Sequence, residues 1–156
     1  MILGLGAMLA RLLHTRNDPA LTVLRVVLGA TFFAHGAQKL LGWFGGEGFA
    51  GNLHSMHELG IGTPLAVLVI VVDFFGGLML VAGLLGRVAA LGILVHMAAG
   101  VFMVHRHFGF FMNWSGGQMG EGIEFNLLAL AAATVIVIGG SGAVSIDRLW
   151  SHRASH

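Results

Sequence analysis

Along this chain, long runs of apolar residues are separated by short segments that hold most of the polar and charged positions. Four of these runs predict membrane spans, at residues 21–41, 65–85, 88–104 and 123–138. A helical span needs about 20 mostly apolar residues, or about 17 to 25 when it is tilted. Because the apolar positions are continuous rather than alternating, and because unpaired backbone groups are costly in lipid, we expect helices rather than barrel strands.

Helix boundary signals support these runs. The sequence Asn17-Asp18-Pro19 places a capping residue and a proline before the first run, and Thr63-Pro64 repeats this pattern before the second. Only Gly86-Arg87 separates the second run from the third, which predicts a tight antiparallel hairpin. We therefore predict an all-α integral membrane protein, an up-down-up-down four-helix bundle made by a single membrane domain of residues 1–156.

The composition agrees with a membrane protein. Of the 156 residues, 56% are hydrophobic and only 10% are charged, which is too little polar surface for an ordinary soluble domain. The chain has no cysteine, which excludes disulfides, dithiol redox motifs and thiolate metal sites, so any redox chemistry needs a borrowed cofactor or a partner. Because the formal net charge is +1 and no basic run occurs, we expect no nucleic-acid partner.

The basic residues predict an orientation in the membrane. Four spans put both chain ends on one side of the membrane. Six of the 8 Lys and Arg residues fall on that side: Arg11, Arg16, Arg25, Arg87, Arg148 and Arg153. Only Lys39 and Arg106 fall on the opposite side. The excess of positive charge predicts cytoplasmic termini, so that the first and third loops face outward.

The first outer loop contains a candidate interfacial helix at residues 48–59. Phe49, Leu53 and Met56 recur there at helical spacing, and polar residues fill the positions between them. Such a pattern is typical of an amphipathic helix that lies on the membrane surface. We expect it to cover the outer end of the bundle.

Ionisable residues within the spans gather toward the predicted outer face. His35, Gln38 and Lys39 follow at i, i+3 and i+4 on the first span, so they share a helix face. Asp73 lies near the middle of the second span, and Glu124 opens the fourth from the outer side. A central Asp, Lys or Arg costs about 2.5 to 3.5 kcal/mol on insertion scales, so Asp73 must pair, take up a proton or line a wet cavity.

The third span predicts a polar stripe. His96, Gly100, Met103 and His107 are spaced at i, i+4, i+7 and i+11, which aims both histidines in the same direction. His105 is expected to point elsewhere. Since His96 and Asp73 lie at matching depths on antiparallel neighbours, we predict that they face one another.

Several of these residues also have a purely structural interpretation. Asp73 can serve packing alone, through a hydrogen bond to His96 or to a neighbouring helix. Lys39 can extend its ammonium group toward lipid headgroups. Glu124 can simply stabilise the start of its helix, because a carboxylate interacts favourably with the positive end of the helix dipole. For Asp73 the functional interpretation is the stronger one, because ionisable residues at membrane depth usually mark a functional site.

Five segments together resemble the DoxX family of four-helix membrane proteins, over about residues 21–150. They are Arg25-Val26-Val27-Leu28-Gly29, residues 35–40, Asp73-Phe74-Phe75-Gly76-Gly77, residues 83–90 with Glu124, and Ser145-Ile146-Asp147. In that family the acid of the second span is usually Glu, so Asp73 is a departure that shortens the side chain by one methylene. The resemblance implies a bacterial inner-membrane protein of the kind named after a subunit of thiosulfate:quinone oxidoreductase.

The polar residues suit the ring of a quinone. In this hypothesis Asp73, His96 and Glu124 are the catalytic groups, since a histidine can donate to a quinone oxygen while the two acids exchange protons. Lys39 would hold an anionic substrate or a partly reduced quinone. The predicted binding residues are His35, Gln38, Lys39, His107, Gly76 and Gly77, the two glycines leaving room for a ring. Because no electron carrier is encoded, transfer must be direct or must use another redox subunit.

Other functions remain open from the sequence. A non-catalytic membrane anchor or assembly subunit for a redox complex would use the bundle only for docking. A small-solute or proton pathway would use the acids and histidines as a relay. We predict no metal site, except that His35 with His96 or His107 could be axial ligands if haem is present.

Overall fold

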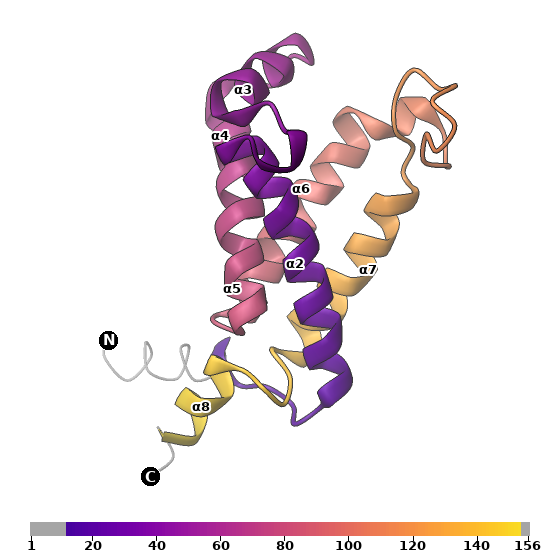
Figure 1. Cartoon of the computed structure of the whole chain (residues 1–156). Coiled ribbons are helices and arrows are strands. Elements are labelled where there is room, and N and C mark those ends of the chain that lie inside the picture. Colours follow the sequence, from indigo (N-terminus) through magenta and orange to yellow (C-terminus); the bar gives the residue numbers. More distant parts are fainter. Residues whose placement is uncertain (1–11, 154–156) are drawn as a thin grey trace, which may run out of the picture.

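The structure is a computed structural model that describes residues 12–153, and every regular element in that part of the chain is a helix (Figure 1). In chain order the elements are α2 (Pro19–Leu41), η1 (Trp43–Gly45), α3 (Gly48–Glu58), α4 (Thr63–Val71), η2 (Val72–Gly76), α5 (Gly77–Ala82), α6 (Gly86–Met103), η3 (His105–Phe108), α7 (Glu124–Gly139) and α8 (Ile146–Arg153). The predicted all-α fold class is confirmed.

The predicted start of the first span is confirmed in atomic detail. The Asp18 side chain caps α2 by accepting a hydrogen bond from the Ala20 backbone N–H at 2.8 Å, and Pro19 occupies the first turn. The helix ends where Gly42 adopts a left-handed φ of 72°, a conformation that glycine takes without steric cost. Capping and proline therefore fix this boundary locally.

The second predicted span is one continuous apolar helix, Thr63–Ala82, made of α4, η2 and α5. It contains a π-helical turn at η2 and ends three residues earlier than predicted, at the left-handed Gly83. Leu85 is also left-handed, with φ 47°, and its backbone N–H donates to Asp147 Oδ1 at 2.7 Å. The tight hairpin is confirmed, but α6 begins at Gly86 because α8 holds the turn.

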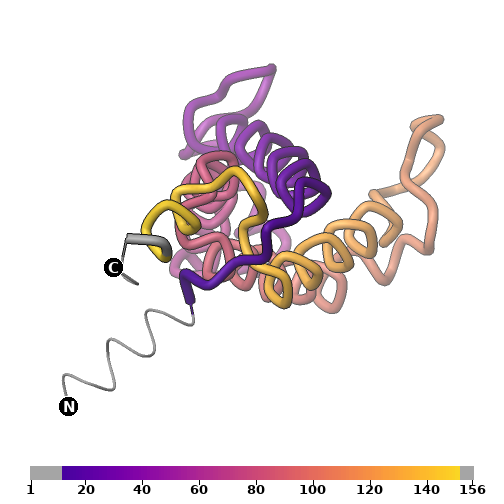
Figure 2. Tube along the Cα trace, turned by 90° about the horizontal axis from the view of Figure 1, so that it is seen from below, coloured from indigo at the N-terminus to yellow at the C-terminus, as the bar shows by residue number. Residues whose placement is uncertain are grey.

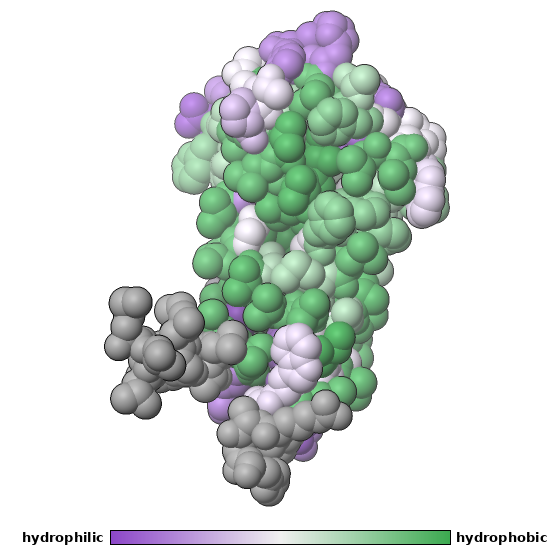
Figure 3. Space-filling view, turned by 90° about the vertical axis from the view of Figure 1, so that its left-hand side faces the viewer, coloured by the Kyte–Doolittle hydropathy of each residue, from purple (hydrophilic) through white to green (hydrophobic). Residues whose placement is uncertain are grey.

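Within residues 12–153, three helices are long and apolar enough to cross a membrane: Pro19–Leu41, Thr63–Ala82 and Gly86–Met103. The fourth predicted run is also an apolar helix, α7, but its 16 residues span only about 24 Å at 1.5 Å per residue. Whether α7 crosses the bilayer completely stays a prediction. On the face shown in Figure 3, apolar residues form a broad band between polar ends, as expected of a surface that contacts lipid.

Glycines bring α2 close to the second apolar helix. A Cβ on Gly29 would lie 2.7 Å from Leu80 Cβ, and a Cβ on Gly77 would lie 2.8 Å from Phe33 Cα. A Cβ on Gly36 would likewise collide with the Phe74 backbone. Small residues allow such backbone approach between membrane helices.

Beside α2 and the apolar helix Thr63–Ala82, α6 packs against α7. Buried apolar side chains form the core between these helices. These include Phe32, Leu80, Ile93, Ala133 and Ile136. Toward the end that carries α3, Figure 1 shows α6 and α7 leaning away from α2 and α4. The helices therefore diverge at this end, which we call the α3 end.

The opposite end, the α8 end, is tied by buried polar groups. Arg25 Nε donates to the Ser141 carbonyl at 2.8 Å, and its other nitrogens donate to carbonyls that end α5 and precede α8. Asp147 accepts from the Gly86 backbone N–H at 2.9 Å and from the Ser141 hydroxyl at 2.5 Å. Viewed from this end, Figure 2 shows the segment after α7 crossing beneath the bundle to reach α8.

Candidate functional site

The site is organised by an ion pair between α2 and the π-helical turn. Lys39 Nζ lies 2.5 Å from Asp73 Oδ2, and Asp73 is 1% exposed whereas the lysine side chain is 24% exposed. The close packing at Gly36 brings the last turn of α2 to η2, so that Lys39 can reach the acid. Asp73 is thus paired, and π-helical turns such as η2 occur frequently at functional sites.

The predicted approach of Asp73 and His96 is present in the structure. His96 Nε2 on α6 lies 3.2 Å from Asp73 Oδ1, with the ring 8% exposed. The two atoms are at ion-pair distance but are not aligned for a hydrogen bond, so within residues 12–153 Asp73 Oδ1 has no hydrogen-bond partner. The His96 ring also interacts with the backbone of Gly92, one turn earlier on α6. Buried polar atoms without partners are costly and uncommon, so we treat the Asp73–His96 pair as a candidate position for binding a ligand or exchanging a proton.

A cavity of about 270 Å³ lies between α2, α6 and α7 on one side of the ion pair, and we call it cavity A. Its lining residues are Phe32, His35, Lys39, Asp73, Met97, His105, Met112, Glu121, Gly122, Phe125 and Asn126. Small-molecule sites are typically apolar cavities of about 300 Å³ or more with a few convergent polar groups. Cavity A has this composition and lies near the lower end of that range.

Aromatic rings shape the wall of cavity A. Phe32 and Phe125 lie 6.3 Å apart between ring centroids, and the His35 imidazole contacts the edge of Phe125 at 5.8 Å. Asn126 is buried beside them, with its Nδ2 3.5 Å from the Met97 sulfur. A flat ring compound can therefore meet aromatic faces and hydrogen-bonding groups in the same space.

A second cavity of about 220 Å³, cavity B, lies on the other side of the ion pair. It is lined mainly by apolar residues of α3, α4, α6 and the connection between α3 and α4, together with Lys39, His96 and His105. Three residues line both cavities: Lys39, Met97 and His105. His96 borders only cavity B, so the structure divides the predicted polar cluster between two spaces.

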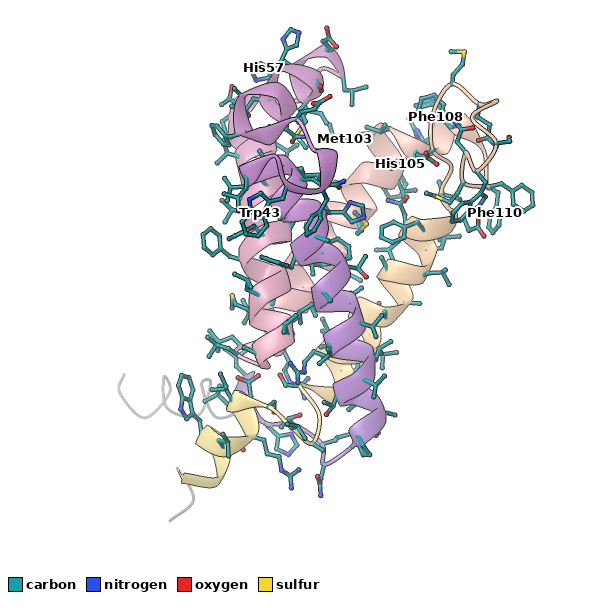
Figure 4. All side chains as sticks on the ribbon, viewed as in Figure 1. Trp43, His57, Met103, His105, Phe108 and Phe110 are labelled. Atoms are coloured by element: carbon teal, nitrogen blue, oxygen red, sulfur yellow. The ribbon has the colours of Figure 1, made fainter. Side chains whose placement is uncertain are left out.

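The orientation predicted for His105 is wrong. α6 ends at Met103, so the helical stripe does not continue to His107, and the 3₁₀ turn of η3 brings His105 to both cavities. Its Nδ1 lies 2.9 Å from the Glu121 carbonyl oxygen, which links it to the loop before α7. Figure 4 places His105 and Met103 at the α3 end of α6.

Other predicted residues lie outside the lining of both cavities. Glu124 accepts a hydrogen bond from the Met112 backbone N–H at 3.1 Å and so holds the loop that covers cavity A. Gln38 donates to the Phe44 carbonyl at 3.4 Å, and His107 lies on η3 beside Arg106. These three residues bear on the site only through the loops that they contact.

Gly76 and Gly77, which were expected to leave room for a ring, do not lie at either cavity. Gly77 is packed against the α2 backbone, and a Cβ on Gly76 would lie 4.0 Å from the Ala89 carbonyl oxygen. Neither glycine borders cavity A or cavity B. Gly77 therefore allows α2 to approach the helix that carries Asp73, whereas Gly76 has no unusually close neighbour.

Across the described part of the chain, no group of three or more His, Asp or Glu side chains is arranged to hold a metal ion. Among the haem ligands considered from the sequence, His35 faces cavity A, His96 faces cavity B and His107 lies on η3. Haem ligation by a pair of these residues stays a prediction.

Sequence reasoning missed several lining residues. Glu121 lies in a loop without helical periodicity, and its carboxylate accepts from the Asn113 backbone N–H at 2.7 Å. Phe32 and Phe125 read in sequence as ordinary apolar span residues. Only Asn126, a polar residue two positions after Glu124 in an apolar run, gave a usable signal.

Comparison with known proteins gives a consistent picture. The model of the DoxX family matches residues 20–106 of this chain. The inner membrane protein YqjF of Escherichia coli is 31% identical over 133 residues, which cover 85% of this chain and 93% of the relative. The uncharacterized membrane protein Rv3486 of Mycobacterium tuberculosis is 28% identical over 153 residues, covering 93% of this chain and 90% of that protein. No solved structure matches the chain closely enough to be called similar.

Proposed function

The chain belongs to the DoxX family of membrane proteins, and from this premise we propose that it is a quinone-linked oxidoreductase subunit of the bacterial inner membrane, with cavity A as the site for the quinone ring. The observation that carries the proposal is the buried Lys39–Asp73 pair in the wall of an aromatic-lined cavity. With cytoplasmic termini, as the distribution of basic residues predicts, cavity A lies in the outer half of the membrane.

The polar groups around cavity A fit the needs of a quinone ring. A bound quinone supplies an acceptor for two electrons and two protons. His35 lines the cavity and its imidazole is a possible hydrogen-bond donor to a quinone oxygen, and the aromatic rings of Phe32 and Phe125 in the same wall suit a planar ring. Lys39 presents a positive charge at the same wall and so favours a ligand that gains negative charge.

Asp73 is the proton-exchanging group in this proposal. Its Oδ2 is held by Lys39, whereas its Oδ1 has no hydrogen-bond partner among residues 12–153 and faces His96. A carboxylate with one held oxygen and one free oxygen can accept a proton without losing its position. His96 is the next proton carrier, since its imidazole lies 3.2 Å away.

The sequence contains no cysteine, and in the described part of the chain no three His, Asp or Glu side chains are grouped as ligands of a metal ion. The electron donor must therefore reach the quinone directly or act through another redox subunit.

The test is saturable binding of a quinone by the purified full chain in nanodiscs. A dimethoxy-methyl benzoquinone without a side chain is titrated by calorimetry, and binding is expected to weaken about tenfold in His35→Ala through loss of a hydrogen bond and a ring contact. His54→Ala is the matched control, because His54 lies exposed on α3 beside Glu58. Absence of binding by the wild type, or equal binding by both variants, would overturn the proposal.

One observation favours a second function, that of a membrane anchor for a redox complex. The loop between η3 and α7 exposes large apolar side chains, with Trp114 85% and Met119 95% exposed. Figure 4 shows Phe110 of this loop on the side of the molecule opposite Trp43. Co-purification of the wild type with a redox subunit, lost in Trp114→Ser together with Met119→Ser, would support this function.

A further inference from the structure

Cavity B differs from cavity A in being almost wholly apolar away from its inner end. Its walls are formed by Met56 and Leu65 on the α3–α4 side, by Val69 on α4 and by Ala99 and Met103 on α6. It lies between the α3–α4 segment and α6, in the region where the ribbons of α4 and α6 diverge toward the α3 end (Figure 1). A cavity of this kind fits the hydrocarbon part of a ligand better than its polar part.

The surroundings of cavity B are apolar and exposed. Leu68 on α4 is 54% exposed, and Val95 and Phe102 on α6 are 61% and 65% exposed. These side chains lie on two of the helices that are long and apolar enough to cross a membrane. Each of them is the sequence neighbour of a lining residue, Val69, His96 or Met103, so we expect lipid rather than water beside the cavity.

The inner end of cavity B is polar. His96 borders it and is nine-tenths buried, and its Nε2 lies 3.2 Å from Asp73 Oδ1 without a hydrogen bond between the two atoms. Lys39 borders the same end and also lines cavity A. Because the two cavities share Lys39, Met97 and His105, they adjoin one another around the lysine.

We propose that cavity B is the side entrance of the site, through which the alkyl chain of an amphipathic ligand extends from lipid while its ring occupies cavity A. The proposal rests on the proposed function, and it adds the ligand class: a ring compound with a hydrocarbon side chain, taken from the membrane and not from water. At the inner end, His96 offers a hydrogen bond to the ring carbonyl oxygen that neighbours the carbon carrying the chain.

The experiment blocks cavity B with a larger side chain on one of two opposite walls. Ala99→Trp fills cavity B from α6, and Val69→Phe fills it from α4. The control is Val95→Trp, which adds the same indole to the same face of α6 one turn earlier, at an exposed residue that does not line the cavity. Two probes are titrated against each protein in nanodiscs: the benzoquinone without a side chain, and the same ring with a decyl chain.

The decyl compound is expected to bind about tenfold more weakly to both blocked variants than to the wild type, with Val95→Trp unchanged. The ring alone is expected to bind all four proteins within about twofold, which also shows that the variants are folded. Comparing proteins with the same probe cancels the partition of the chain into lipid.

The two proposals fail differently. If the ring binds but the decyl compound binds equally to all four proteins, the side entrance is overturned while the quinone site stands. If neither probe binds the wild type, the proposed function is overturned and the side entrance with it. A decyl chain carrying a photoreactive end group gives a second readout, since crosslinks to residues 56–69 and 99–104 are expected, and crosslinks confined to exposed flanks would contradict the entrance.

Discussion

Lys39 Nζ on the last turn of α2 contacts Asp73 Oδ2 in the π-helical turn of the neighbouring apolar helix, at 2.5 Å. The contact joins two segments 34 residues apart. It compensates a carboxylate that is almost completely buried in a helix long and apolar enough to cross a membrane. The lysine is partly exposed, so it also connects the acid with the cavities that it borders.

The first prediction concerns the strength of this pair. Lys39→Met leaves Asp73 buried without its cation and is expected to destabilise the protein by about 3 kcal/mol, because an unpaired buried charge is more costly than a buried pair. The double variant Lys39→Met with Asp73→Leu should regain most of that loss. Thermal unfolding in detergent measures both, and strictly additive effects of the two substitutions would show that the pair is not coupled.

The second prediction separates function from packing at Asp73. Asp73→Asn keeps the shape and removes the charge, so the protein should insert and purify like the wild type but lose quinone binding by about tenfold or more. Glu47→Gln is the matched control, because it removes a carboxylate that contacts Ser55 on the surface at the α3 end. Normal binding by Asp73→Asn would assign this residue to packing alone.

The third prediction uses two adjacent glycines. Gly77→Ala places a Cβ 2.8 Å from Phe33 Cα and 2.9 Å from the Gly29 carbonyl oxygen, so we expect a loss of about 1 to 3 kcal/mol from overpacking. At Gly76 the nearest atom is 3.8 Å away, so Gly76→Ala should change stability by no more than about 1 kcal/mol. Melting temperatures that fall equally in both variants would contradict the close packing of α2 on α5.

The fourth prediction tests orientation and the number of spans. The chain has no cysteine, so single cysteines at Ser55 on α3 and Ser151 on α8 can be labelled without background. An impermeant thiol reagent applied to inverted and right-side-out vesicles should label the two positions from opposite sides, with Ser151 on the cytoplasmic side. Labelling of both from one side would rule out the proposed arrangement.

Much of the fold is determined by the sequence itself. The apolar runs, the capping Asp18 with Pro19 and the left-handed glycines act within a few residues, so they fix helix positions without help from distant segments. The depth of Asp73 in an apolar run is also enough to show that the acid needs a partner, because a lone charge there is costly. Helical spacing predicted His35, Gln38 and Lys39 on a common face; His35 and Lys39 both line cavity A, whereas Gln38 donates to the Phe44 carbonyl.

Tertiary contacts decided which polar groups meet. The end of α6 at Met103 and the loop that follows bring His105 to the cavities, although helical periodicity aimed it elsewhere. The same loop engages Glu124 through the Met112 backbone, which keeps that acid out of cavity A. His35 lines cavity A and His96 lines cavity B because α6 leans away from α4 and α2. That arrangement of the helices is set by packing between residues far apart in sequence. Periodicity describes one helix at a time, so it cannot specify the space that several diverging helices enclose.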